Sequence, residues 1–258
     1  MKKSALKNLL YPAGFFIALL AVWEAVSRLN AVPAFILPAP SMVIVTLFTE
    51  FEVMSGHILI TLYETLTGFL ISVILSILIA VLMDSIPVVR KTLYPLLVIS
   101  QTVPIIILAP LFIIWFGYGY LPKIIIVILI CFFPITVNLL QSLAAADKEL
   151  ISLLKSMGAS KLKIYRFVKV PSSLPGFFSG LKIAAAYSIM GATIGEWVGG
   201  KNGLGVYMIR AKQSFNTDRV FAAIIVITVL SIIFLKIIEY FERKSMPWRN
   251  IHEEYYVE

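Results

Sequence analysis

Residues 149–171 read ELISLLKSMGASKLKIYRFVKVP and form a polar island between apolar runs that are long enough to cross a bilayer. The apolar residues of its first half are Leu150, Leu153, Leu154 and Met157. Their i, i+3, i+4, i+7 spacing places four apolar side chains on one face of a helix. Gly158 follows at the position where a helix commonly ends in a left-handed residue. The sequence therefore predicts that a first short helix ends at this glycine.

The second half of the island predicts another short helix. Ser160 is suited to cap it, and Ile164, Phe167 and Val168 would lie on one side. The opposite side would be basic, with Lys155, Lys161, Lys163, Arg166 and Lys169. Pro171 is expected to close the unit. Periodicity alone leaves two interpretations open: the island binds a partner protein, or it is an amphipathic loop on anionic lipid.

Composition places the chain in the membrane. Of its 258 residues 60% are hydrophobic and only 14% are charged, whereas soluble domains carry about 25% charged residues. The net charge of +8 does not indicate nucleic-acid binding, because most basic residues lie in particular loops between apolar runs. The single cysteine, Cys131, excludes a disulfide framework and a cysteine-based metal site within one chain. The N-terminus resembles a signal peptide but lacks a small-x-small cleavage pattern, so its apolar run is read as a retained span.

The apolar runs predict an all-α integral membrane protein with about six transmembrane helices in one domain, residues 1–258. The expected spans lie near 9–29, 59–83, 93–116, 122–141, 174–198 and 219–241. The polar island then lies in the loop 142–173 between the fourth and fifth spans.

The distribution of Lys and Arg predicts the orientation. With an even number of spans, the N-terminal segment, the second-to-third loop, the fourth-to-fifth loop and the C-terminal tail share one side. These four regions carry three, two, six and three basic residues in turn, which are Lys2, Lys3, Lys7, Arg90, Lys91, Lys148, Lys155, Lys161, Lys163, Arg166, Lys169, Arg243, Lys244 and Arg249. The other side carries only Arg28, Lys123, Lys201, Arg210, Lys212 and Arg219. We therefore expect a multi-pass protein of the cell membrane with both termini and the polar island in the cytoplasm.

The stretch 30–58 contains no Lys or Arg and is interrupted by three prolines. Ser41 is suited to cap a short helix that runs through Phe51. We expect an external re-entrant or interfacial segment here, because the stretch is too interrupted to be a further span.

Polar groups inside the expected spans indicate where a pathway for solute lies. Gln101 and Thr102 stand just before Pro104, and proline in a membrane helix frees a carbonyl that must be satisfied. Such a broken helix lines a cavity or is a kink satisfied by a neighbouring helix. Asn138 and Glu196 are further candidates for the pathway. The alternatives are an interhelical hydrogen bond for Asn138 and an interfacial Glu–Trp pair for Glu196.

The chain contains no pattern typical of catalysis. Gly195 to Lys201 matches G-x4-G-K, but Asn202 follows in place of Ser or Thr, and the run leaves a membrane helix. His57 and His252 are expected on opposite sides of the membrane, which excludes a metal pair or a catalytic dyad between them. The chain is therefore not expected to be an enzyme, and any energy for transport must come from another subunit.

The polar island resembles the cytoplasmic loop of ABC-importer permeases. Gly158 is followed, after nine residues, by Val168-Lys-Val-Pro171, which is similar to the family's Gly–nine residues–Ile-x-Leu-Pro pattern. The loop signature begins with Glu-Ala-Ala, and this chain has Ser152-Leu153-Leu154 there. The resemblance continues in collinear order, and specifically to the nitrate/sulfonate/taurine-type branch, through LPAPS (37–41), LTGFL (66–70), QTVPIIILAPLFIIWFGYG (101–119), LPGFFSGLKIA (174–184), GEWVGGKNGLG (195–205), FNTDRVFAAI (215–224) and PWR (247–249).

This resemblance implies a permease subunit with the type I importer fold. It also implies a cytoplasmic ABC ATPase pair that carries ATP and Mg²⁺, an extracytoplasmic solute-binding protein and a second permease subunit, for which we expect another copy of this chain. The permease itself would hold no cofactor. The residues expected to couple it to the ATPase are Leu150, Ser152, Leu153, Leu154, Met157, Gly158, Ala159, Ser160, Lys161 and Pro171. Each leucine has the alternative of packing on its own membrane core.

The solute stays open between several classes. Thiamine-precursor pyrimidines, riboflavin-like vitamins, aliphatic sulfonates, taurine and nitrate are all carried by members of this branch. The stretch 195–224 is most similar to the vitamin and pyrimidine-precursor members. The alternative function is a self-contained secondary transporter or channel.

Overall fold

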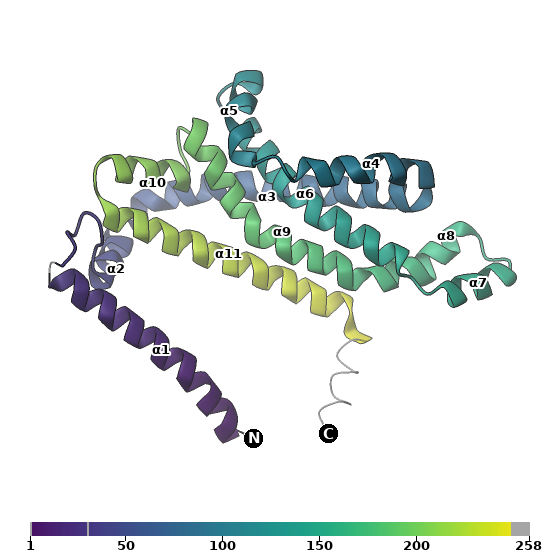
Figure 1. The fold of residues 1–258 in the computed structure, drawn as a ribbon, viewed down its shortest axis with the longest axis horizontal. Helices are drawn as coiled ribbons and strands as arrows, with labels where there is room; N and C mark the ends of the chain where they lie inside the picture. The colour runs from purple at the N-terminus through teal and green to yellow at the C-terminus, as the bar shows by residue number, and fades with distance from the viewer. Residues whose placement is uncertain (1, 30, 249–258) are drawn as a thin grey trace.

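The computed structural model describes residues 2–29 and 31–248, and these contain helices and no strand (Figure 1). The helices are α1 (Lys2–Arg28), α2 (Pro40–Thr49), α3 (Phe51–Ser85), α4 (Pro87–Ser100), α5 (Ile105–Phe116), α6 (Leu121–Ala144), α7 (Lys148–Ser156), α8 (Lys161–Ile164), the π-helical turn η1 (Tyr165–Lys169), α9 (Val170–Gly199), α10 (Leu204–Gln213) and α11 (Thr217–Ser245). The expected all-α class is confirmed. Arg249, counted above with the cytoplasmic residues, lies outside the described residues.

Four helical stretches of the described chain are long and apolar enough to cross a membrane: α3, α6, the continuous run Lys161–Gly199 and α11. The pair α4 and α5 makes a fifth candidate if the two count as one broken span. The first expected span, 9–29, coincides with α1 as far as Arg28, and the side chains of several of its residues lie outside the described part.

The third expected span, 93–116, is not one helix. It is divided between α4 and α5, which are bent by 100° relative to each other. Pro104 is the residue before α5 and has an extended backbone, with φ −62° and ψ 118°. Proline has no N–H to continue the ladder and disfavours the helical conformation of the residue before it, so the helix breaks here.

The helices α6 and α9 form the centre of the bundle and approach each other closely. A Cβ atom added to Gly180 of α9 would lie 2.8 Å from the carbonyl oxygen of Pro134 in α6, so only glycine fits. α3 packs on α6 in the same way, with Gly68 against Val127, and it also contacts α9. The core between these helices consists mainly of Phe69, Val127, Cys131, Ile135, Phe178, Leu181, Ala184, Ala185 and Ala192.

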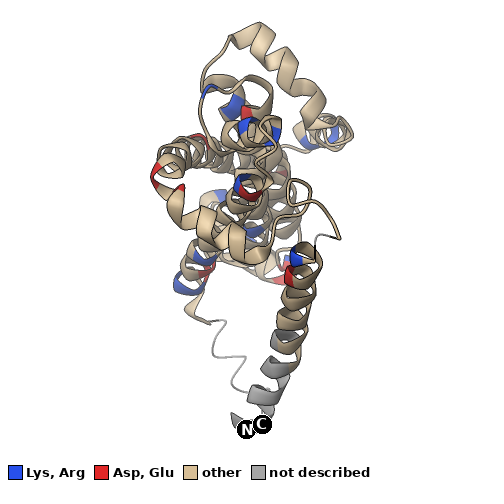
Figure 2. Ribbon diagram, turned by 90° about the vertical axis from the view of Figure 1, so that its left-hand side faces the viewer, with Lys and Arg blue, Asp and Glu red and all other residues tan. Residues whose placement is uncertain are grey.

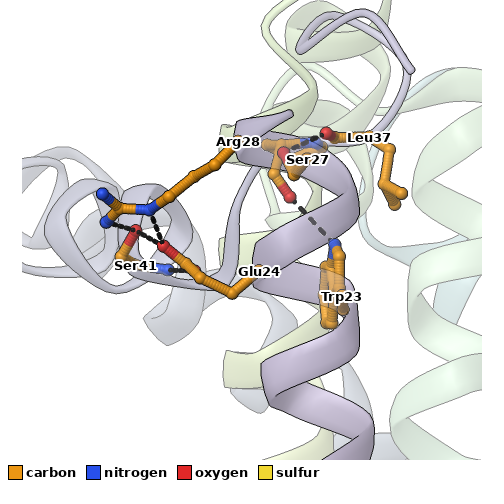
Figure 3. Close-up of polar contacts among 7 residues, drawn as sticks. Trp23, Glu24, Ser27, Arg28, Leu37 and Ser41 are labelled. Carbon is orange, nitrogen blue, oxygen red and sulfur yellow. Dashed lines mark hydrogen bonds and ion pairs between the residues drawn. The ribbon is translucent and has the colours of Figure 1, made fainter. Parts of the chain in front are cut away.

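α1 stands apart from this bundle and meets it at one end (Figures 1 and 2). There Glu24 accepts hydrogen bonds from the backbone N–H of Ser41 at 3.0 Å and from its hydroxyl at 2.7 Å (Figure 3). Trp23 Nε1 donates to the carbonyl of Pro38 at 3.0 Å, and Ser27 Oγ donates to that of Leu37 at 2.9 Å. These contacts fix the end of α1 to the start of α2.

The role expected for Ser41 is therefore wrong. α2 begins at Pro40, with Ala39 at its N-cap and no side-chain cap, and it ends at Thr49 before Phe51. The hydroxyl of Ser41 bonds to Glu24 in place of capping the helix. Proline fits the first helical position without a cap because its missing N–H would be unpaired there anyway.

Candidate functional site

The polar island folds as a capped helix that ends at a glycine. The side chain of Asp147 accepts hydrogen bonds from the N–H groups of Glu149 at 2.8 Å and Leu150 at 3.2 Å, which caps the start of α7. Gly158 has φ 76°, so the left-handed residue predicted from the sequence is present. The N–H of Gly158 donates to the carbonyl of Lys155, and that of Ala159 donates to Leu154, both at 2.9 Å. These two bonds are the pattern of a Schellman motif.

The second half of the island differs in part from expectation. Ser160 caps α8 as predicted, since its Oγ accepts from the N–H of Lys163 at 3.4 Å. Pro171, however, does not close the unit. It lies in the first turn of α9, where proline is tolerated, and the chain stays helical from α8 through η1 into α9. The wider π turn changes the register, so Phe167 is 64% exposed while Ile164 and Val168 are buried.

The apolar stripe on α7 is not covered by any other part of residues 2–29 and 31–248. Leu153 is 56% exposed and Met157 is 73% exposed, and Leu150 is exposed as well. α7 and α8 project at one end of the molecule, away from α2 and α10 at the other end (Figure 1). The alternative that the leucines pack on their own membrane core therefore does not hold for Leu150 and Leu153. The structure leaves this face free for another molecule.

The base of the island is fixed to the end of α3. Lys169 Nζ lies 2.6 Å from Oδ2 of Asp84, and the hydroxyl of Tyr165 donates to the same carboxylate. Ser85 Oγ is 2.9 Å from the Tyr165 hydroxyl. The polar island is therefore joined to α3 by polar contacts, in addition to its continuation into α9.

A second feature is a cavity of about 710 Å³ at the break between α4 and α5. Its walls come from that break, from α5, from α6 and from α9. Gln101 and Asn138 both line it, so the structure brings together two of the four residues proposed for the pathway. Thr102 is exposed but is not among the lining residues, and its hydroxyl donates to the carbonyl of Ile99 at 2.8 Å.

The comparisons with known proteins agree with this architecture. Residues 72–246, more than half of the chain, match the family model described as the inner membrane component of a binding-protein-dependent transport system. The chain belongs to this family. It is an ABC-importer permease, as the resemblance of its polar loop implied.

Several curated relatives cover nearly the whole permease. It is 37% identical over 242 residues to the formylaminopyrimidine transport permease ThiX of Halalkalibacterium halodurans, covering 93% of this chain and 96% of the relative. It is 32% identical to the riboflavin transport system permease RibX of Chloroflexus aurantiacus, over 89% and 87% of the two chains. It is 30% identical to the putative aliphatic sulfonates transport permease SsuC of Bacillus subtilis, over 96% and 89%.

Glu196 of the permease does not line the cavity. Its side chain is buried, with the residue 1% exposed, and it accepts hydrogen bonds from Thr61 Oγ1 at 2.6 Å and from the N–H of Gly205 at 2.5 Å. Thr61 Oγ1 in turn accepts from the N–H of Leu204 at 2.9 Å. Glu196 therefore holds the start of α10 against α3 and α9, and neither an exposed vestibule nor a headgroup contact fits this burial.

A buried ion pair lies close to this network and was missed by sequence reasoning. Lys123 Nζ of α6 is 3.0 Å from Oε1 of Glu64 in α3, and both side chains are almost fully buried. The two charged residues within apolar runs were a signal for such a pair, because charged residues within membrane helices are usually paired with one another. The sequence did not indicate which two helices carry the partners.

Proposed function

We propose that α7 and the Gly158 turn of this permease dock into a groove on a cytoplasmic ABC ATPase and transmit its movement to the membrane helices. The observation that carries this proposal is the exposed apolar stripe of Leu150, Leu153 and Met157 on a helix capped at both ends. An amphipathic helix with apolar anchors at i, i+3 and i+7 is suited to bind a groove on a partner. ATP and Mg²⁺ would be bound by that partner and not by this chain.

The remaining coupling residues fit the same proposal. Ser160 and Lys161 begin α8 next to the turn, Ser152 lies on α7, and Pro171 starts the helix that enters the membrane. The Asp84–Lys169 pair joins this unit to α3. Closure of the ATPase pair would thus move α3 and α9 together, which is how the spans would alternate between outward- and inward-facing states.

The opposite end of the molecule is the proposed contact for a solute-binding protein. α2 and α10 lie together there, far from α7 (Figure 1). α2 is fixed to α11, since Thr46 Oγ1 donates to Asp218 at 2.7 Å and Arg219 pairs with Glu50 at 2.8 Å, and α10 packs on α11 as well. In this proposal both termini and α7 face the cytoplasm, α2 and α10 face the outside, and a second copy of the chain completes the pathway.

The proposal is tested by co-purifying the permease with candidate ATPases. Gly158→Val strains a left-handed turn without creating a clash, because no atom lies within 4 Å of the added Cβ. Gly56→Val is the matched control, since its Cβ also meets nothing within 4 Å and its backbone φ is not positive. We expect loss of ATPase association and of solute-stimulated hydrolysis only for Gly158→Val. Unchanged association and hydrolysis in Gly158→Val would show that this loop is not the coupling element.

The solute of the proposed importer is a small molecule of one of the classes that its relatives name. These names include a formylaminopyrimidine and riboflavin on one side and aliphatic sulfonates on the other.

A further inference from the structure

The cavity beside the break between α4 and α5 has an uncharged lining throughout the described residues. Most of its lining is aliphatic or aromatic, and its polar side chains are Gln101, Asn138 and Tyr187. Its volume of about 710 Å³ lies within the range of about 300–1,000 Å³ that is typical of small-molecule sites. A few hydrogen-bonding groups in an apolar pocket are also typical of such sites, because they orient the ligand.

The three polar side chains that line the cavity have hydrogen-bonding groups that a ligand could use. Asn138 Nδ2 donates to the carbonyl of Pro134 at 2.7 Å, which leaves its carbonyl oxygen and its second N–H without a partner among the described residues. The amide of Gln101 and the hydroxyl of Tyr187 likewise have no hydrogen-bond partner there. The cavity thus presents donors and acceptors of neutral groups.

The apolar wall is suited to a flat ring. Phe133 and Tyr187 contribute aromatic faces, and Pro104 and Pro134 contribute rigid aliphatic ones. An aromatic heterocycle gains from offset or edge contacts with such rings in addition to burial of its area.

The cations of α6 and α9, which form two walls of the cavity, are already neutralised. The single lysine of α6, Lys123, is paired with Glu64 at 3.0 Å, and the single lysine of α9, Lys182, is paired with Glu242 at 2.9 Å. A sulfonate or nitrate entering this cavity would lose hydration and meet no free cation on either helix. An unpaired charge in an apolar environment is costly, whereas a neutral ring is not.

We propose that this cavity is a solute-contact site for an uncharged heterocycle of the aminopyrimidine class, held by Gln101, Asn138 and Tyr187. The permease itself then contributes to selectivity and disfavours anionic sulfonates. This inference rests on the proposed import function and adds the class of solute. It places the chain with the relative named for formylaminopyrimidine transport in preference to the one named for aliphatic sulfonates.

The test measures binding directly. Full-length permease in lipid nanodiscs, without binding protein or ATPase, is dialysed against labelled formylaminopyrimidine or against labelled ethanesulfonate, an aliphatic sulfonate that carries only a negative charge. The variants are Asn138→Leu and Tyr187→Phe. Asn138 packs beside Gly180, so its change can disturb α6 and α9, whereas Tyr187→Phe removes one oxygen from a half-exposed side chain. The matched controls are Gln141→Leu, on the exposed side of α6, and Tyr240→Phe, on an exposed position of α11.

We expect saturable binding of the pyrimidine and none of ethanesulfonate, with each cavity variant weakening binding about threefold to tenfold, as loss of one hydrogen bond does. The two controls should bind as the wild type does. The inference is overturned if the wild type does not bind the pyrimidine, if ethanesulfonate binds as tightly, or if the cavity variants bind normally. A co-purified phospholipid that the pyrimidine does not displace would also overturn it. ATPase co-purification from the same preparation reports on the proposed function separately.

Discussion

Lys169 and Asp84 connect the polar loop to the membrane bundle across 85 positions of sequence, with Nζ 2.6 Å from Oδ2. The carboxylate side chain is 5% exposed and the lysine side chain is 18% exposed, so solvent screens the pair only weakly. Tyr165 adds a third group to the same carboxylate. The loop that faces the partner is therefore joined to two membrane helices, α9 by the chain and α3 by this cluster.

Asp84→Asn is expected to weaken the coupling between the ATPase and the membrane helices more than it lowers the stability of the permease. The amide keeps one acceptor for Tyr165 or Lys169 but loses the charge, which costs about 1–3 kcal/mol for a charge-assisted hydrogen bond. We expect transport and solute-stimulated ATPase activity to fall severalfold while the permease still co-purifies with the ATPase. Glu52→Gln, an exposed carboxylate at the opposite end of α3, serves as control. Full stimulation in Asp84→Asn would exclude a coupling role for the pair.

Leu153→Glu is expected to abolish ATPase binding without unfolding the permease. Leu153 is exposed in the isolated chain, so the added carboxylate disturbs no packing, but it would be buried in the proposed groove. Lys155→Glu places the same carboxylate on the opposite face of α7 and should retain association. The measurement is ATPase recovery on tagged permease, with the amount of folded permease determined by gel filtration. Equal recovery with Leu153→Glu would contradict the placement of the stripe in the groove.

Glu196→Ala is expected to destabilise the end of the bundle that carries α10. The change leaves the N–H of Gly205 without its acceptor in a buried site, which costs about 1–3 kcal/mol, and it removes the shorter bond of the Thr61 hydroxyl, which can still donate to the carbonyl of His57 at 3.2 Å. Thermal unfolding in detergent measures this as a lower Tm. Glu52→Ala, an exposed carboxylate, should leave Tm nearly unchanged. A Tm for Glu196→Ala equal to that of the wild type would show that these contacts do not stabilise the permease.

The proposed orientation in the membrane can be tested by labelling single cysteines with a maleimide that does not cross the membrane. The native Cys131 is buried and should not react. Met157→Cys on the polar loop and Phe48→Cys on α2 both replace side chains that are more than half exposed. We expect Met157→Cys to react only in inside-out vesicles and Phe48→Cys only in right-side-out vesicles. The reverse result would place the polar loop outside and remove its access to an ATPase.

Local patterns predicted the polar loop well. The apolar spacing before Gly158, the left-handed glycine and the Ser160 cap all depend on residues within one or two turns, and the structure contains all three. The π turn that exposes Phe167 and carries the chain past Pro171 was not predictable in this way. It depends on how α9 joins α8 and on the contacts of Tyr165 with α3.

The rest of the candidate site could not be predicted from the sequence, because it depends on contacts between helices that are far apart in the chain. Gln101 and Asn138 were identified as polar residues in apolar runs, and the cavity that joins them requires the bend at Pro104. Glu196 had the same signature in sequence, but its partners Thr61 and Gly205 bury it elsewhere. The Glu64–Lys123 pair could not be predicted for the same reason. Periodicity in the sequence identifies the face of a helix that is buried, but it does not identify which other helix packs on that face.

The most direct test of the central claim is uptake in proteoliposomes that contain the permease, its ATPase and the solute-binding protein. The labelled solute is formylaminopyrimidine, and each component is omitted in turn. The account predicts uptake only when ATP and all three proteins are present, and its loss in Leu153→Glu. Uptake by the permease alone, without ATP or partners, would contradict the account and establish a self-contained carrier or channel.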